Sequence, residues 1–169
     1  AGSYSGKFGD FGLDAYVGFS SGHRVYAAPV GASITGRNNP FAGSGGGVVT
    51  WGPIAFGGAY ERLYDSDTPN NSATVSSGHQ QRDTWDIGPR YTMGPFSVSV
   101  DWTRAIYKNR NVNSGAQNDV YSLSTDYVLG PGIDVGIGVD YTHYKSSAAG
   151  NADPNYSGLA IMAGTGIAF

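Results

Sequence analysis

The chain has 169 residues and a formal net charge of −3, and only 14% of its residues are charged while 13% are aromatic. Soluble domains average about 25% charged residues, so an ordinary soluble domain is disfavoured. The sequence has no cysteine, which excludes disulfides and thiolate metal sites, and it has no basic patch typical of nucleic-acid binding. It also lacks a run of about 18 consecutive apolar residues, the minimum for a transmembrane helix.

The first strand signal lies near the N-terminus, where the alternation of apolar and small or polar residues changes phase. Tyr4 and Phe8 stand at even-numbered positions, whereas the apolar residues of segment 11–19 stand at odd-numbered positions. We call the set of alternate positions that shares one side of a strand a parity. A turn at Phe8–Phe11 would give nine strands in total, with the termini on opposite sides of a membrane. A bulge within one strand would give eight, which could close into a small barrel. The first residues show no basic start followed by an apolar stretch, so we expect that a signal peptide has been removed or that the chain begins inside a longer protein.

Seven further strands are predicted from Gly45 onward by period-2 alternation. The first of them runs from Gly45 to residue 51. The other six cover residues 54–61, 85–91, 96–103, 121–129, 133–142 and 157–169. Short Gly-Pro turns join some of them, at 52–53, 94–95 and 130–131. Long polar segments join the others, at about 36–47, 65–82, 108–118 and 146–155. Short turns on one rim and long loops on the other are typical of outer-membrane barrels, whose short turns face the periplasm.

Aromatic residues recur at a fixed spacing on the apolar parity. Three pairs lie six residues apart, namely Trp85 and Tyr91, Phe96 and Trp102, and Tyr121 and Tyr127. Six residues of strand span about 20 Å, which is the right order for two aromatic girdles around the apolar belt of a membrane barrel. Together with Trp51, these residues form the predicted girdle. Cross-strand aromatic packing in a β-sandwich is the alternative.

The opposite parity carries carboxylates on most of the predicted strands. A carboxylate facing lipid is costly, so this parity is predicted to face water, and its only clear basic residue is Arg90. The predicted pore-lining residues are Asp14, Glu61, Asp86, Arg90, Asp101, Asp126, Asp134 and Asp140. Such an acidic wall would attract cations and give a mild cation preference; a solvated face without a role in selectivity is the alternative. The many Gly and Ser residues on this parity would underfill a closed eight-stranded barrel.

Three segments resemble Gram-negative porins. Residues 163–169, ending in Phe169, resemble the closing strand of these porins, and residues 126–132 look like the penultimate hairpin of α-proteobacterial general porins. Residues 6–14 resemble a periplasmic turn from the middle of such a porin. The resemblance implies a barrel of about sixteen strands that forms a trimer, with residues 1–169 as its C-terminal half and Phe169 as the signal for the barrel-assembly machinery. The first strands of that family and its pore-narrowing loop have no counterpart here.

Metal-binding and catalytic chemistry find little support. The chain contains three histidines, His23, His79 and His143. None has a second histidine at ligand spacing, so we predict no metal and no cofactor. Asp83 and His79 could activate water or a nearby Ser76 or Ser77, but polar loop residues facing water are the simpler interpretation. The Gly-rich segment 43–47 lacks the lysine and the helix of a phosphate loop.

Basic residues gather near the predicted outer rim, at Arg104, Lys108 and Arg110. They could contact lipopolysaccharide phosphates through charge-assisted hydrogen bonds. A solvated rim explains them equally well.

The sequence therefore predicts one all-β domain over residues 1–169, an antiparallel up-and-down β-barrel in a bacterial outer membrane. The predicted function is that of a non-enzymatic porin for passive diffusion of small hydrophilic solutes and ions. Its predicted partners are outer-membrane lipid, lipopolysaccharide, the barrel-assembly machinery and further copies in a homotrimer, but not nucleic acid. The alternatives are a small closed barrel with a structural, adhesion or binding role through its long loops, a barrel enzyme, and a soluble barrel for an apolar ligand.

Overall fold

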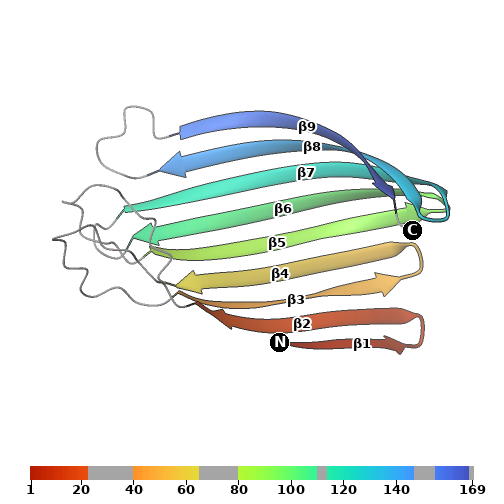
Figure 1. Ribbon diagram of the computed structural model, residues 1–169, viewed down its shortest axis with the longest axis horizontal. Helices are drawn as coiled ribbons and strands as arrows, with labels where there is room; N and C mark the ends of the chain where they lie inside the picture. The colour runs from red at the N-terminus through yellow and green to blue at the C-terminus, as the bar shows by residue number, and fades with distance from the viewer. Residues whose placement is uncertain (23–39, 65–79, 110–113, 147–154, 168–169) are drawn as a thin grey trace.

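The computed structural model describes residues 1–22, 40–64, 80–109, 114–146 and 155–167. They form one antiparallel sheet of nine strands, which lie side by side in sequence order (Figure 1). The strands are β1 (Gly2–Phe8), β2 (Phe11–Ser21), β3 (Phe41–Trp51), β4 (Ile54–Tyr64), β5 (Gln80–Met93), β6 (Phe96–Asn109), β7 (Ser114–Gly130), β8 (Ile133–Ser146) and β9 (Asn155–Ile167). The described residues include no helix that is long and apolar enough to cross a membrane.

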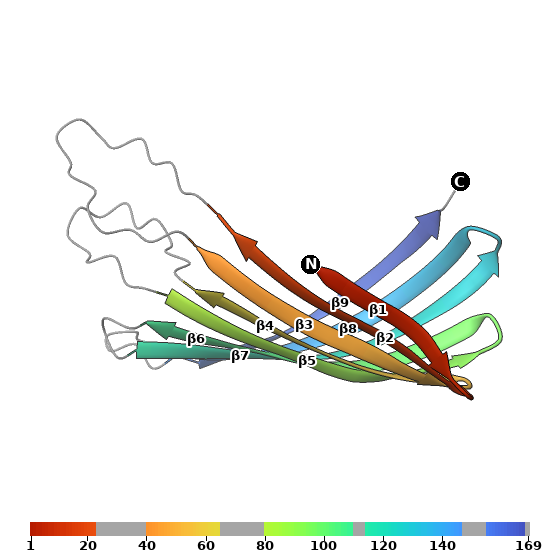
Figure 2. The ribbon, with the colours of Figure 1, turned by 90° about the horizontal axis from the view of Figure 1, so that it is seen from below.

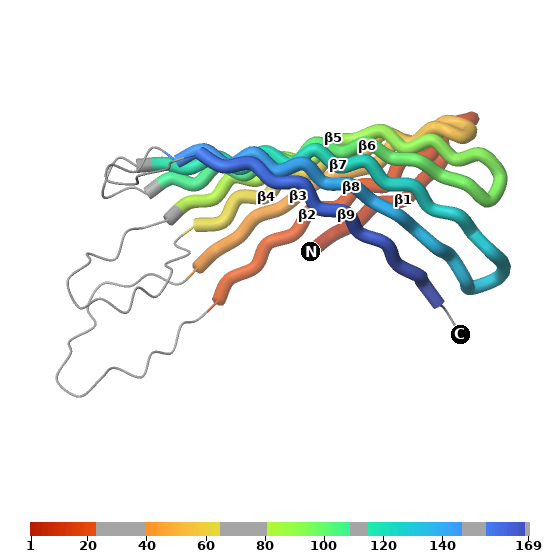
Figure 3. The backbone as a smooth tube through the Cα atoms, turned by 90° about the horizontal axis from the view of Figure 1, so that it is seen from above, coloured from red at the N-terminus to blue at the C-terminus, as the bar shows by residue number. Residues whose placement is uncertain are grey.

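The sheet curves across its width into an open trough (Figures 2 and 3). β1 and β9 are its two edges, and each pairs with one neighbour only within the described part of the chain. The nine-stranded interpretation of the sequence is therefore confirmed. The alternative of a closed eight-stranded barrel is wrong.

Glycines close the tight turns along one rim of the sheet. They are Gly9, Gly52, Gly94 and Gly132, with φ angles of 61°, 54°, 59° and 76° respectively. Residues with a Cβ rarely adopt these positive angles, which glycine adopts freely. Phe8 pairs with Phe11 across the first turn, so Gly9 and Asp10 form a two-residue hairpin loop. The phase change in the sequence is therefore a turn between two strands and not a bulge within one.

The described residues bury no apolar side chain, so the sheet has no hydrophobic core of its own. Large apolar side chains are instead widely exposed, for example Phe19 at 68%, Trp51 at 56% and Ile161 at 69%. Burial of apolar surface is the main driving force of folding. Another apolar medium must therefore cover this surface, and in a membrane barrel lipid does so.

The strand register divides the sheet into two faces. Directly opposed residues of an antiparallel pair point to the same side, so eight successive pairings extend one parity across all nine strands. Trp51 opposes Phe11 and Ile54, and Ile54 opposes Tyr91; we call this apolar side the outward face. The other side, which includes Asp14, is called the polar face.

The predicted boundaries of the long connections are wrong, because the strands extend further into these segments than the alternation of apolar residues indicates. β3 begins at Phe41, β5 at Gln80 and β7 at Ser114, all inside segments predicted as loops. At the start of β5 the outward residues Gln81 and Asp83 are polar, like their neighbours. Without an apolar parity, the sequence has no strand signal there.

The Gly-rich segment of β3 is a regular strand, although its composition resembles a loop. Its missing side chains leave room for aromatic rings from β2. A Cβ added at Gly46 would lie 2.9 Å from Cε1 of Tyr16, and one at Gly43 would lie 3.5 Å from the ring of Phe19. The rings therefore cover the glycines and supply the contacts that the strand itself lacks.

We expect Gly46→Val to destabilise the fold by about 1–3 kcal/mol, because the new side chain would overpack the sheet. Its Cβ would lie 2.7 Å from the carbonyl oxygen of Gly58 as well as close to Tyr16. Gly164→Val is the matched control on the same face, since a Cβ there meets nothing within 4 Å. Urea unfolding of the protein folded in detergent measures both. Equal midpoints for the two variants would contradict the close packing of Tyr16 over Gly46.

Candidate functional site

The eight predicted pore-lining residues all lie on the polar face of the sheet. Asp86 opposes Ala59 and Thr103, Asp126 opposes Ser97 and Gly136, and Asp140 opposes Ser122 and Ala160. The complete set is Asp14, Glu61, Asp86, Arg90, Asp101, Asp126, Asp134 and Asp140. The register thus brings charged residues from six strands, β2 and β4–β8, to one surface. Their role as a pore lining stays a prediction.

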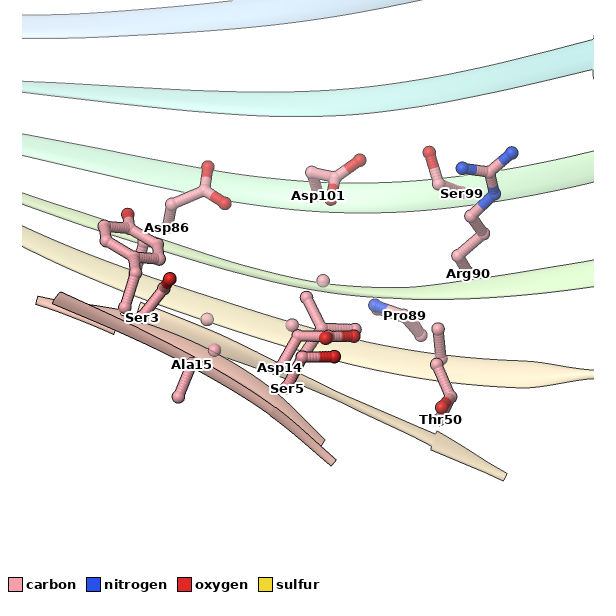
Figure 4. A pocket seen from close by; sticks show the side chains of 18 of the residues that line it. Ser3, Ser5, Asp14, Ala15, Thr50, Asp86, Pro89, Arg90, Ser99 and Asp101 are labelled. Atoms are coloured by element: carbon pink, nitrogen blue, oxygen red, sulfur yellow. The ribbon is translucent and has the colours of Figure 1, made fainter. Parts of the chain in front are cut away.

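A hollow of about 870 Å³ lies on the polar face and is lined by residues of β1–β6. Four of the predicted residues, Asp14, Asp86, Arg90 and Asp101, line it. Figure 4 shows Asp86, Arg90 and Asp101 projecting from neighbouring strands into the same open space. Small residues make up much of the remaining wall, so the charged groups project above a low floor of short side chains.

Hydroxyl groups connect charged residues across this face. Arg90 Nη2 donates to Ser97 Oγ at 2.9 Å, and Ser97 Oγ donates to Asp126 Oδ2 at 3.4 Å. This series crosses β5, β6 and β7. Thr103 Oγ1 likewise donates to Asp86 Oδ2 at 2.5 Å. The hydroxyls orient the carboxylates and leave their negative charge in place.

The polar face is less purely acidic than the sequence indicates. Arg82 lies on it and contacts Glu61 through Nη2 and Oε1 at 2.5 Å, and Lys7 of β1 has the same parity. Sequence reasoning missed Arg82 because it assigned residues 65–82 to a loop; its even spacing from Arg90 was the available signal. Over the described strands, seven carboxylates and three basic side chains share this face, which leaves a formal net charge of −4.

The predicted aromatic girdle residues all lie on the outward face. Phe96 opposes Tyr127, and Trp102 opposes Tyr121. The remaining members of the set are Trp51, Trp85 and Tyr91. The structure adds partners that the spacing missed: Tyr60 lies 4.2 Å from Trp85, and Phe11 lies 5.9 Å from Trp51, between ring centroids. One aromatic row lies at the tight-turn ends of the strands. The other lies near mid-strand, where Trp85 is the sixth residue of β5 and Trp102 the seventh of β6; contact with a membrane interface stays a prediction.

Other residues singled out in the sequence fall elsewhere. Outside the described residues lie Phe169, His23, His79, Ser76, Ser77 and Arg110. His143 lies on β8 opposite Asp119. Asp83 lies in strand β5 and not in a loop, and its carboxylate accepts hydrogen bonds from Tyr60 and Arg62. Within the described ranges, no group of three or more His, Cys, Asp or Glu residues could hold a metal ion.

Comparison with solved structures identifies the fold. OmpT, an outer membrane protein of Vibrio cholerae folded in vitro, matches 99% of this chain with a TM-score of 0.67 and 15% sequence identity. A deletion mutant of the same protein that lacks loop L8 matches 96% of this chain, with a TM-score of 0.66 and 15% identity. The chain spans about half of these structures, 48% and 50% of their lengths. Together with the two faces of the sheet, these matches show that the chain has the fold of an outer-membrane β-barrel.

The family follows from the sequence comparison. The profile of a family described as Gram-negative porin matches residues 1–148, and the chain belongs to that family. A search of curated proteins found no match. The predicted resemblance to Gram-negative porins and the predicted outer-membrane location are confirmed. The α-proteobacterial type and the assignment to a C-terminal half stay predictions.

We expect Glu61→Gln to change the free energy of unfolding by no more than about 1 kcal/mol, because ion pairs between exposed side chains contribute little. The side chains of Glu61 and Arg82 are 41% and 37% exposed. Ser97→Ala is the comparison: Ser97 is 4% exposed, and loss of its hydrogen bonds should cost about 1–3 kcal/mol. Urea titration in detergent distinguishes them. A larger loss for Glu61→Gln than for Ser97→Ala would contradict this ranking.

Proposed function

We propose that this chain forms part of the wall of a water-filled channel for passive diffusion of small hydrophilic solutes and ions. The observation that supports this most directly is the segregation of the two faces. Seven carboxylates lie on the polar face, whereas the outward face is largely apolar over most of its height. A wall of this kind separates water from lipid. The channel performs no catalysis.

We further propose that the channel prefers cations mildly. The polar face has a formal net charge of −4 over the described strands, and within them only Glu61 forms a salt bridge on this face. A wall with excess negative charge raises the local concentration of cations and lowers that of anions. The preference is mild because Lys7, Arg82 and Arg90 offset part of the charge.

We propose secondly that residues 1–169 are the C-terminal half of a barrel of about sixteen strands. Such a barrel would be of the α-proteobacterial general type. The size of the channel follows from this, because barrels with about sixteen strands leave an aqueous channel. Coverage of 48% and 50% of the matched structures supports a partner half of similar length. The small residues of the polar face support a wide interior. We also propose a homotrimer, with Phe169 as the recognition signal for the barrel-assembly machinery.

Removing three carboxylates from the polar face tests the cation preference. We expect the triple variant Asp101→Asn, Asp126→Asn, Asp140→Asn to move the reversal potential in a potassium chloride gradient toward zero, because the excess negative charge of the wall falls. Planar-bilayer recording of the intact protein measures it. Asp10→Asn, in a tight turn, is the control and should leave the potential near the wild-type value. An unchanged potential in the triple variant would refute the acidic wall.

The mass of the intact polypeptide tests the half-barrel proposal. Residues 1–169 account for 17.6 kDa, so we expect the boiled polypeptide from its native membrane to have roughly twice this mass if it builds about sixteen strands. Mass spectrometry of the extracted protein decides. A mass near 17.6 kDa would rule out the single-chain sixteen-stranded barrel.

A further inference from the structure

Charged side chains on the outward face form a single band near the rim of the long connections. Over the described strands, its members are Arg62, Asp83, Arg104, Lys108, Asp119 and Lys145; we call them the rim band. No other described residue of the outward face carries a formal charge at neutral pH. The charges of this face are therefore confined to one depth.

The depth of the rim band can be read from the strand lengths. A tilted strand crosses the hydrocarbon of a membrane in about 9–11 residues. Counted from the tight turn, Arg104 is the ninth residue of β6 and Lys108 the thirteenth, because β6 begins at Phe96. Lys145 is the thirteenth residue of β8, which begins at Ile133. The band therefore lies at the far edge of the hydrocarbon and just beyond it. In outer-membrane barrels this is the extracellular side, where the long loops lie.

A buried carboxylate organises the first part of the band, across β4 and β5. Asp83 is only 4% exposed. Tyr60 Oη donates to its Oδ1 at 2.8 Å and Arg62 Nε at 2.5 Å, while Gln81 Nε2 donates to its Oδ2 at 3.0 Å. Lys108 Nζ lies 3.6 Å from the same Oδ2. These contacts hold two basic side chains around one carboxylate.

The arrangement is repeated across β6 and β7. Asp119 is 5% exposed, and its Oδ1 accepts hydrogen bonds from Trp102 Nε1 at 3.1 Å and Arg104 Nε at 2.6 Å. Gln117 Nε2 donates to Oδ2 at 2.6 Å. In both arrangements an aromatic residue and an arginine stand two positions apart on one strand. They face a glutamine and an aspartate that stand two positions apart on the next strand. The repeat fixes the direction of each guanidinium group.

The rim band has an excess of positive charge, with four basic side chains against two carboxylates. Lys108 is 55% exposed, and Lys145 is also exposed. The two lysines line a hollow of about 310 Å³ that also includes Gln117. Gly115, which lines the hollow between them, has no side chain to fill it. Two exposed ammonium groups thus border an open recess at the membrane surface.

We propose that the rim band binds the phosphate groups of lipopolysaccharide. A phosphate matches the sign of the band, and arginine and lysine are its usual protein ligands. The position also fits, because the band lies just beyond the aromatic row of Tyr60, Trp85 and Trp102, and such rows occur at the level of lipid headgroups. The two guanidinium groups are held in place by Asp83 and Asp119, while the two lysines supply exposed charges around the recess.

A second copy of the chain is a poorer occupant of this surface. Two copies that met through the rim band would bring like charges together, which opposes association. A lipid with several phosphates neutralises the excess charge without that cost. The proposal depends on the outer-membrane location and not on the proposed channel function.

The test is a binding titration of the intact protein in detergent with purified lipopolysaccharide, before and after enzymatic removal of its phosphates. We expect the double variant Lys108→Gln, Lys145→Gln to bind the phosphorylated form roughly 30-fold more weakly, since each basic side chain near an anionic membrane surface contributes about fivefold. Both lysines are exposed, and the variant removes only the 3.6 Å contact between Lys108 and Asp83. The six hydrogen bonds that enclose Asp83 and Asp119 involve neither lysine and stay in place. Wild-type protein should prefer the phosphorylated form.

Two controls sharpen the result. Lys7→Gln removes a lysine from the polar face beside a tight turn, and should bind like the wild type. The double variant Lys108→Arg, Lys145→Arg keeps the charge and should retain binding. Equal binding of wild type and the glutamine variant, or of the two lipopolysaccharide forms, would overturn the proposal. A changed number of subunits with unchanged binding would also overturn it and would make the band a subunit contact.

Discussion

The ladder of hydrogen bonds between neighbouring strands is the constraint on which the rest of this structure depends. In the hydrocarbon of a membrane, no water is present to satisfy a backbone N–H or C=O group, so a neighbouring strand must do so. Eight successive antiparallel pairings link the nine strands in this way. Once the ladder is formed, the parity of a residue decides which medium its side chain meets, and a slip of one residue would exchange the two faces. The absence of a hydrophobic core among the described residues is a consequence of this arrangement.

Parity and depth together decide where charge is tolerated. On the polar face carboxylates occur at many heights, as expected of the proposed water-facing wall. On the outward face charge occurs only in the rim band, and the two carboxylates there are enclosed by donors. An enclosed carboxylate without partners would be costly, which explains why Asp83 and Asp119 each accept hydrogen bonds from three side chains. The two faces therefore have opposite net charge within one sheet.

The strands could be predicted from the sequence wherever the outward residues meet hydrocarbon, because there alternate positions must be apolar. The turns could also be predicted, since Gly52 and Gly94 precede proline at positions that require a positive φ. The signal failed above the hydrocarbon, where Gln81 and Asp83 are polar on the outward face and the segment resembles a loop. Arg82 was missed for the same reason.

The contacts within the site could not be predicted from one strand at a time. The salt bridge of Glu61 with Arg82 depends on the register between β4 and β5, and the series from Arg90 to Asp126 crosses three strands. Glycine composition misled the prediction at β3, because the rings that cover Gly43 and Gly46 come from another strand. Parity can be read from a sequence, whereas register arises only when strands pair.

Across the described strands, each one pairs only with its neighbours in the sequence, so the architecture is modular at the level of the hairpin. A duplication or loss of one whole hairpin would change the circumference of a barrel and leave the inward and outward residues of all other strands unchanged. A single-residue insertion inside a strand would instead turn carboxylates toward lipid from that point to the next turn. Length variation in such a wall is therefore expected in steps of two strands, with the tight glycine turns and the long connections as the boundaries at which the sequence can be cut and rejoined.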